Sequence, residues 1–273
     1  MPYVQARDGT PLHYNDWGSG PPVVLIHGWP LNADMWEYQS VPLGMQGTRV
    51  ITYDRRGFGR SGQPWTGYDY NTLADDLAAV MDKLDLRGAT LVGFSMGGGE
   101  VARYLSRVGT GRVAKAALVS AVTPYLLKTA DNPDGVEKSV FDSIIKGLQE
   151  DRPHFLAGFG KTFFGAGLLN FTVTNEILQW ALMMALQASP KATLDCAHAF
   201  AETDFRPDMA AFKLPTLIIH GAADETVPPE VSARRAAKMI PDARYIEYEG
   251  APHALMFTNR DRLNQDLLTF VKG

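Results

Sequence analysis

Short runs of apolar residues alternate along this chain with segments in which apolar residues recur every three or four positions. The short runs are typical of buried β-strands. The last of them alternates more with polar residues and suits the edge of a sheet. We therefore predict strands over residues 22–26, 49–53, 89–92, 113–119, 215–219 and 244–248.

Two amphipathic helices are predicted by apolar stripes over residues 73–84 and 263–271. Either Asn71 or Asp69 can cap the first helix, and Gly88 lies just past its end. Strands that alternate with helices in this way are typical of a mostly parallel sheet with helices on both faces. The sequence therefore predicts an α/β fold.

This alternation stops in one long stretch, where helical patterns rich in Phe, Met and Ala follow one another without strands. We interpret residues 124–211 as a helical cap inserted into an α/β core. The core then has two parts, residues 1–123 and 212–273. We find no internal repeat or low-complexity segment.

Composition narrows the class of protein. The chain of 273 residues is 45% hydrophobic and 21% charged, with a net charge of −4, which is ordinary for a globular protein. No basic stripe suits nucleic acid. No run approaches the ~18 apolar residues of a membrane span, and the first residues lack the apolar region of a secretion signal. The single cysteine, Cys196, excludes an intramolecular disulfide and Cys-rich zinc patterns. We therefore expect a cytoplasmic protein with no nucleic-acid or membrane partner.

A candidate nucleophile follows the strand predicted at 89–92. Gly93-Phe94-Ser95-Met96-Gly97 matches G-x-S-x-G, and a probable helix starts directly after it. In this strand–turn–helix setting the serine occupies a sharp, strained turn that exposes its hydroxyl. The Met96 N–H lies at the helix start, where free backbone donors favour negative charge. Ser95 is therefore the predicted nucleophile, and Met96 supplies half of an oxyanion hole.

A serine hydroxyl needs a general base, and the base needs an acid to orient it. His253 lies in a loop after the last predicted strand, and we predict it as the base. We interpret His220 as a packed strand-end histidine, and we expect packing or surface roles for His154 and His198. Asp224 is the predicted acid, with Glu225 as its rival.

The second oxyanion donor is expected in the loop after the strand at 22–26. We choose the N–H of Trp29, because Pro30 restricts Trp29 to extended conformations and would help hold that N–H in place. Residues 57–62 spell G-x-G-x-x-G, the fingerprint of dinucleotide binding. That motif needs a helix start, however, and this stretch continues as a loop, so we expect no nicotinamide or flavin.

These motifs resemble the bacterial cofactor-free haloperoxidase (perhydrolase) and aryl-esterase branch of the α/β-hydrolases, which includes γ-lactamase-like members. The most branch-specific matches are His-Gly-Trp-Pro within residues 24–37 and Gly-Phe-Ser-Met-Gly-Gly-Gly within residues 91–100. Further matches occur at 52–61, 201–208, 220–224 and 250–253. Together they run over nearly the whole chain.

The resemblance implies an α/β-hydrolase fold with a mostly parallel, eight-stranded sheet flanked by helices and an inserted helical cap. It implies Ser95, Asp224 and His253 as the triad, and Trp29 and Met96 as backbone oxyanion donors. It also implies no cofactor or metal. The family forms homo-oligomers, so we expect a trimer or a dimer of trimers.

The expected reaction is cleavage of a small carboxylic ester through an acyl-enzyme on Ser95. Hydrogen peroxide in place of water would give a peracid, and a proline at the Pro30 position accompanies this activity in the resembling family. The candidate substrate-binding residues are Trp29, Pro30, Phe94, Val122, Phe141, Phe159, Val227 and Leu255.

Several other functions remain open from the sequence. The same triad can serve a γ-lactamase or amidase, or a carbon–carbon bond hydrolase. Carbon–carbon bond hydrolases usually place Asn before the nucleophile, where this chain has Phe94. A ligand receptor on this fold can also retain an intact triad.

Overall fold

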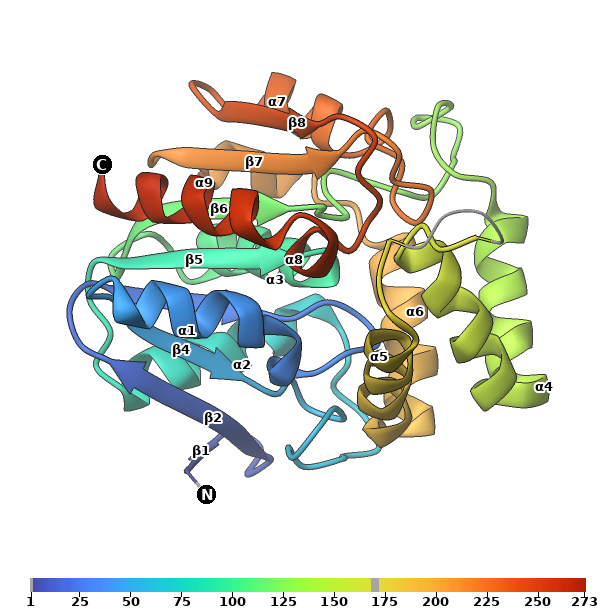
Figure 1. The fold of residues 1–273 in the computed structure, drawn as a ribbon, viewed down its shortest axis with the longest axis horizontal. Helices are drawn as coiled ribbons and strands as arrows, with labels where there is room; N and C mark the ends of the chain where they lie inside the picture. Colours follow the sequence, from blue (N-terminus) through green and yellow to red (C-terminus); the bar gives the residue numbers. More distant parts are fainter. Residues whose placement is uncertain (1, 168–171) are drawn as a thin grey trace.

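An eight-stranded sheet runs through the computed structural model, which describes residues 2–167 and 172–273 (Figure 1). The strand order is β1-β2-β4-β3-β5-β6-β7-β8. Strand β1 pairs antiparallel with β2, β2 pairs antiparallel with β4, and the remaining pairs are parallel. The strands are β1 (Tyr3–Gln5), β2 (Pro11–Gly18), β3 (Pro22–Ile26), β4 (Arg49–Tyr53), β5 (Ala89–Phe94), β6 (Val113–Val119), β7 (Thr216–Gly221) and β8 (Arg244–Tyr248).

The predicted strands are present as β3 to β8. The prediction for β5 ended two residues early, and β7 lies slightly further along the chain than predicted. Strand β8 lies at one edge of the sheet, as its alternating pattern indicated. The mostly parallel α/β fold is confirmed.

Successive residues of each strand belong in turn to two hydrophobic cores, one on each face of the sheet. In β3, Val24 and Ile26 belong to one core, whereas Val23 and Leu25 belong to the other. This follows from the two-residue period of a strand, whose side chains point to opposite faces in turn. Both faces are covered, which is why β3 is an unbroken apolar run.

The helices that cover these faces come from both parts of the chain. Helices α1 (Glu37–Met45), α8 (Leu255–Thr258) and α9 (Arg260–Lys272) lie on the face that is in front in Figure 1, and α2 (Tyr70–Lys83), α3 (Met96–Arg107) and α7 (Ala233–Met239) lie behind it. Two 3-10 turns, Ala33–Trp36 and Pro207–Ala211, join the layers. The predicted stripes face these cores: Leu73 and Leu77 of α2 enter one, and Leu263 and Leu267 of α9 the other.

Helix α2 begins at a side-chain cap. The Asp69 carboxylate accepts hydrogen bonds from the N–H groups of Asn71 and Thr72 at 3.0 and 3.1 Å. It thereby pairs two of the donors that the first turn leaves free. Of the two cap residues considered from the sequence, the structure selects Asp69.

Three helices between β6 and β7 lie beyond the carboxyl ends of the parallel strands (Figure 1). They are α4 (Lys138–Phe163), α5 (Asn175–Gln187) and α6 (Pro190–Glu202), and we call them the cap helices. They fall within the segment 124–211, of which residues 168–171 lie outside the described residues.

Helix α4 is broken inside its length. Asp151 has a non-helical backbone, with φ of −151° and ψ of 83°, and its carboxylate accepts the His154 N–H at 3.0 Å. Pro153 follows two residues later, in the first turn of the new helix, where its missing N–H is tolerated. The second half of α4 therefore starts as a new, capped helix and runs back toward the sheet.

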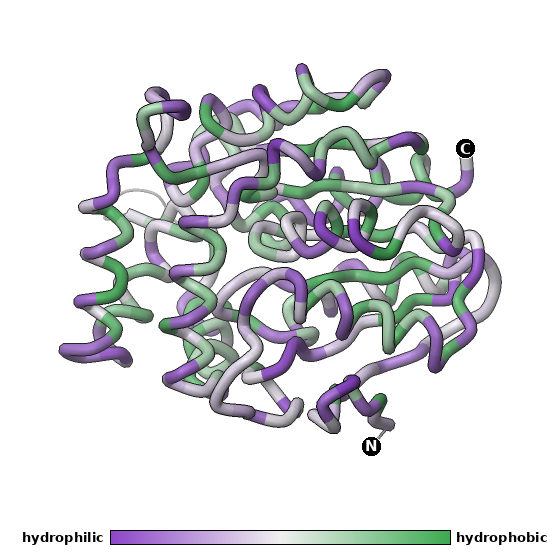
Figure 2. The backbone as a smooth tube through the Cα atoms, turned by 180° about the vertical axis from the view of Figure 1, so that it is seen from behind, coloured by the Kyte–Doolittle hydropathy of each residue, from purple (hydrophilic) through white to green (hydrophobic). Residues whose placement is uncertain are grey.

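Hydropathy follows this layered arrangement. Figure 2 shows hydrophobic positions along the central strands and alternation of hydrophilic and hydrophobic positions along the outer helices. No helix in residues 2–167 and 172–273 combines the length and the apolar character that crossing a membrane requires. Residues 57–62 form turns rather than a helix start, as expected for a loop.

Candidate active site

Ser95 occupies a strained turn between β5 and α3. Its φ of 53° and ψ of −118° fall in a region that residues with a side chain rarely adopt, at a cost of about 1–3 kcal/mol. Gly93 and Gly97 make the turn possible, because a Cβ on Gly93 would lie 2.4 Å from the Gly97 carbonyl oxygen. A Cβ on Gly97 would lie 2.6 Å from the carbonyl oxygen of Ile26. The two glycines of the motif are therefore a steric requirement of this turn.

Ser95, His253 and Asp224 form one chain of hydrogen bonds. The His253 Nε2 atom lies 3.0 Å from Ser95 Oγ, and His253 Nδ1 lies 2.6 Å from Asp224 Oδ2. Asp224 follows β7, and His253 lies between β8 and α8, so both come from loops at the carboxyl edge of the sheet. All three are buried, with 6%, 1% and 3% of the surface of Ser95, His253 and Asp224 exposed.

The Asp224 carboxylate is held in its ionised form. Burial acts to raise the pKa of Asp224, but the adjacent His253 and His220 outweigh it and hold that pKa well below its usual range. Its Oδ1 atom accepts the N–H groups of Thr226 and Val227 at 2.9 and 2.8 Å. An ionised Asp224 orients His253 with Nδ1–H toward itself, which leaves the Nε2 lone pair facing Ser95.

Glu225, the rival acid, is placed differently. Its side chain is exposed and lines the mouth of the cavity described below. The structure thus brings Asp224 to His253 and leaves the neighbouring carboxylate in solvent.

The loop after β3 is oriented by a buried histidine. His27 Nε2 accepts the Arg55 backbone N–H at 2.9 Å, so Nδ1 carries the proton and donates to the Gly28 carbonyl oxygen at 2.9 Å. Burial and the nearby Arg55 lower the pKa of His27 to about 3, so the ring is neutral. Since C=O and N–H point in opposite directions in a trans peptide, the Trp29 N–H is directed away from His27.

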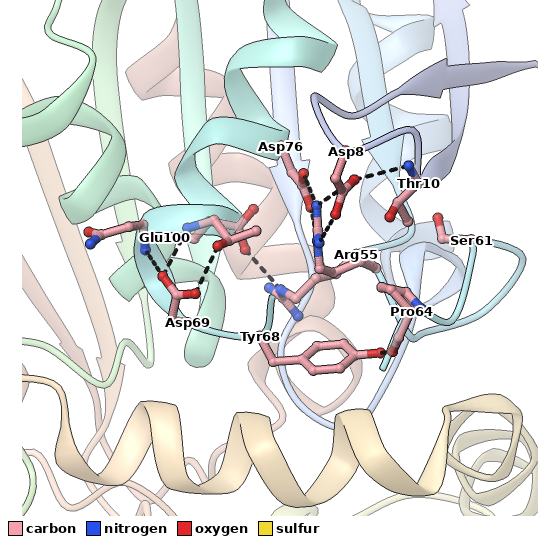
Figure 3. Close-up of polar contacts among 12 residues, drawn as sticks. Asp8, Thr10, Arg55, Ser61, Pro64, Tyr68, Asp69, Asp76 and Glu100 are labelled. Carbon is pink, nitrogen blue, oxygen red and sulfur yellow. Dashed lines mark hydrogen bonds and ion pairs between the residues drawn. The ribbon is translucent and has the colours of Figure 1, made fainter. Parts of the chain in front are cut away.

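A buried ion pair connects this loop to the helix that follows Ser95. Arg55 donates to the Glu100 carboxylate at 2.8 Å (Figure 3). It also donates to the His27 carbonyl oxygen at 2.7 Å. Burial raises the pKa of Glu100 and lowers that of Arg55, so each charge depends on the other. The pair holds α3 and the loop 27–30 in one arrangement.

The two backbone donors predicted for an oxyanion hole belong to the loop after β3 and to the first turn of α3. Met96 is the first residue of α3, so its N–H lacks a partner within the helix. The Trp29 indole donates to the Thr193 carbonyl oxygen of α6 at 3.0 Å and packs against the Phe159 and Phe200 rings. The Trp29 side chain thus packs under the cap helices. The backbone N–H of Trp29 is therefore the group that this residue can offer as the predicted oxyanion donor.

Ser95 opens into a largely apolar cavity of about 630 Å³ beneath the cap helices. The predicted residues that line it are Trp29, Val122, Phe141, Phe159 and Val227. Its other apolar lining side chains are Leu126, Val136, Val140, Ile144, Phe155, Phe200 and Pro228. Within the part of the chain that the structure describes, no group of three or more His, Cys, Asp or Glu side chains is arranged to hold a metal ion.

Three residues predicted for substrate binding lie elsewhere. Pro30 lines a smaller neighbouring cavity of about 190 Å³, and Phe159 borders both cavities. Phe94 is fully buried behind His253, with their ring centroids 4.8 Å apart. Leu255 is fully buried in the core that α9 covers. Phe94 and Leu255 therefore pack behind the His253 loop and do not line the cavity of Ser95.

Other lining residues were missed because they lie in the cap. His154, expected in a packing or surface role, is exposed at the cavity, beside Phe155 at the break in α4. Phe200 lies four residues after the buried Cys196 on one face of α6. That helical spacing is a signal that could have identified Phe200 as an inward-facing residue.

Comparison with known proteins agrees with this geometry. The pattern of the α/β hydrolase fold family matches residues 21–260. The chain is 44% identical to a non-haem chloroperoxidase of Streptomyces lividans over 100% of both chains, and 39% identical to a bifunctional esterase/perhydrolase of Acinetobacter calcoaceticus, also over 100% of both. A crystal structure of a bromoperoxidase from Bacillus anthracis is 46% identical and superposes with a TM-score of 0.97, covering 100% of this chain and 99% of that one.

The chain therefore belongs to the α/β-hydrolase fold family. The resemblance to its non-haem haloperoxidase and esterase branch, seen in the motifs at 24–37 and 91–100, is confirmed by these relatives.

Proposed function

We propose that this protein is a serine hydrolase that cleaves small carboxylic esters through an acyl-enzyme on Ser95. One observation carries the proposal: the Ser95 Oγ, His253 and Asp224 form a continuous hydrogen-bonded chain at the floor of an apolar cavity. A serine paired with a base in this way is an activated nucleophile. The lining by aromatic and branched side chains suits an apolar acyl or aryl group.

The first half of the reaction forms the acyl-enzyme. His253 Nε2 takes the Ser95 proton while Oγ attacks the ester carbonyl carbon. The N–H groups of Trp29 and Met96 stabilise the resulting oxyanion, and one such donor typically contributes about 10²–10³ in rate. His253 then gives its proton to the departing alcohol, and Asp224 stabilises the imidazolium in between.

The second half releases the acid. Water enters the cavity, His253 takes a proton from it, and the hydroxide oxygen attacks the acyl carbon. Collapse of the second tetrahedral intermediate breaks the bond to Ser95 Oγ and returns the proton from His253 to the serine. We propose that the segment 124–211 selects substrates, because its aromatic residues form much of the cavity wall.

Ester hydrolysis by the wild type and by Ser95→Ala tests this proposal. We expect the wild type to turn over p-nitrophenyl acetate, and the variant to lose nearly all of that activity while keeping its fold. Full activity in the Ser95→Ala variant would refute the acyl-enzyme scheme.

We also propose perhydrolysis as a second activity of the same acyl-enzyme. Hydrogen peroxide replaces water, so the acyl group leaves as a peracid and Ser95 regains its proton. Support comes from the relative that is both esterase and perhydrolase, and from Pro30 in the loop beside Trp29. Pro30→Leu should lower the ratio of peracid to acid at a fixed peroxide concentration. An unchanged ratio would remove Pro30 from this role.

The relatives favour esters over the other substrates considered. Their names describe haloperoxidases and an esterase/perhydrolase rather than lactamases, carbon–carbon bond hydrolases or receptors. A panel of esters, a γ-lactam and a vinylogous ketone distinguishes the enzymes. Slow ester turnover together with tight binding of a small ligand would instead indicate a receptor.

We further propose that the enzyme acts in the cytoplasm as a homo-oligomer of three or six chains. The family resemblance supports the assembly.

A further inference from the structure

A second histidine touches the carboxylate of Asp224. His220 is the last but one residue of β7 and is fully buried. Its Nε2 atom lies 3.1 Å from Asp224 Oδ2 and 2.8 Å from the carbonyl oxygen of Val227. Sequence reasoning interpreted His220 as a packed strand-end residue, and packing alone does not require either of these contacts.

The neighbours of the His220 ring show which of its two nitrogen atoms carries a hydrogen. Both neighbours of Nε2 are acceptors, so Nε2 carries a hydrogen, which it donates to the Val227 carbonyl oxygen beside the Asp224 carboxylate. The Nδ1 atom is buried and has no hydrogen-bond partner among the described residues. His220 therefore contacts Asp224 and Val227 through Nε2 alone.

The Oδ2 atom of Asp224 therefore contacts the imidazole rings of both His253 and His220. It accepts His253 Nδ1–H at 2.6 Å and lies 3.1 Å from His220 Nε2, while Oδ1 accepts the N–H groups of Thr226 and Val227. Each donor takes up part of the carboxylate charge. The share that His220 takes is not available to stabilise a protonated His253.

We propose that His220 is a positioning residue that fixes the Asp224 carboxylate against His253 and moderates the basicity of His253. Its hydrogen bond to the Val227 carbonyl oxygen anchors the turn 224–227 to β7, and its contact with Oδ2 restricts the rotation of the carboxylate. This inference rests on the proposed function, in which Asp224 orients His253. It adds a fourth side chain to the chain of hydrogen bonds that begins at Ser95.

Glu247 is a further charged residue near His220, and it is paired with an arginine. Glu247 of β8 pairs in register with His220, and Arg234 holds its carboxylate at 2.8 and 2.9 Å. The contacts of the His253 imidazole ring with described residues are Ser95, Asp224 and the rings of Phe94 and Phe163. Asp224 is thus the charged group through which His220 can reach His253.

Two substitutions of similar size separate donation from packing. Glutamine can place an amide N–H where Nε2 lies, whereas methionine fills the space without a donor. We expect His220→Met to lower kcat/KM about tenfold or more, and His220→Gln to retain most of it. The acid limb of the pH profile of kcat/KM, which reports protonation of His253, should move to higher pH by about half a unit or more in His220→Met, because Oδ2 has lost a competing donor.

A residue that only packs gives a different result. Equal kcat/KM in the two variants, or a loss in His220→Met with an unmoved acid limb, would overturn the proposal. If His220→Met fails to fold, His220→Asn replaces it, because the shorter amide cannot reach Oδ2 from that backbone position. The proposed function is tested separately by Ser95→Ala, so a failure of the His220 proposal leaves it intact.

Discussion

Asp224 and Glu225 are adjacent on one loop, and the sequence predicts Asp224 as the acid with Glu225 as its rival. The structure distinguishes them by burial and direction: Asp224 lies 2.6 Å from His253 Nδ1, and Glu225 is exposed at the cavity mouth. The difference arises from the turn 224–227, whose N–H groups fix the Asp224 carboxylate. Such a turn depends on backbone conformation, which residue identity alone did not specify.

Replacing the Asp224 carboxylate by an amide tests its role. Asp224→Asn keeps the shape of the side chain but offers an N–H to His253, which favours the wrong tautomer. We expect kcat for an ester to fall by about 10³–10⁴-fold. Glu225→Gln is the matched control and should retain most of the activity. Similar losses in both variants would contradict the assignment of Asp224.

Acid should lower the free energy of unfolding by protonating Asp224. The pKa of Asp224 is lower in the folded protein than in the unfolded chain, where it is about 3.9. Its ionisation therefore stabilises the fold above about pH 4, and this contribution is lost as the pH falls further. Denaturant unfolding at pH 7 and pH 3.5 should show a smaller pH dependence for Asp224→Asn than for wild type. An identical dependence would show that Asp224 does not contribute.

At the scale of elements, the sequence predicted the parallel part of the sheet better than its beginning. Strands β3 to β7 are buried on both faces and appear as apolar runs. Strands β1 and β2 were not assigned ranges, because they are antiparallel, partly exposed and poor in continuous apolar residues. The break in α4 was also missed, since Pro153 is compatible with both a loop and a helix start.

The cap of helix α2 gives a prediction at this scale. Asp69→Ala removes the acceptor for two N–H groups and should lower the free energy of unfolding by about 1 kcal/mol. Asn71→Ala, the alternative cap considered from the sequence, should cost less because its side chain accepts a hydrogen bond from the half-buried Arg103 instead. Chemical denaturation of both variants measures the difference. A larger cost for Asn71→Ala would contradict this capping arrangement.

At the scale of the whole molecule, the site is assembled from distant segments: the loop at 27–30, the turn at 93–97, the loops that carry Asp224 and His253, and the cap helices. The core positions were predictable, because the carboxyl ends of parallel strands meet at one edge of the sheet. The positions of the side chains in the cap helices were less predictable. Which aromatic residues face inward depends on how α4 folds back at Asp151, and neither Phe155 nor Phe200 was assigned to the cavity.

Exposed apolar residues on α1 and β2 offer a surface through which chains of the proposed homo-oligomer can contact one another. Val41 and Met45 lie one turn apart on α1, which contacts the strand β2 that carries Trp17, and all three residues are exposed, Met45 to 82%. Exposed apolar groups that cluster in this way often mark contacts between subunits. Size-exclusion chromatography with light scattering should give the mass of three or six chains, and Met45→Glu should lower it if this surface is used. A monomeric wild type would contradict the proposed oligomer.

The activated Ser95 can be tested directly with a fluorophosphonate probe, which reacts covalently with serines that an adjacent base deprotonates. We expect one probe per chain, located by mass spectrometry on the peptide that contains Ser95, together with loss of ester hydrolysis. Asp224→Asn should react far more slowly. Labelling at another residue, or ester hydrolysis that persists when Ser95 is fully labelled, would contradict the assignment of Ser95 as the nucleophile.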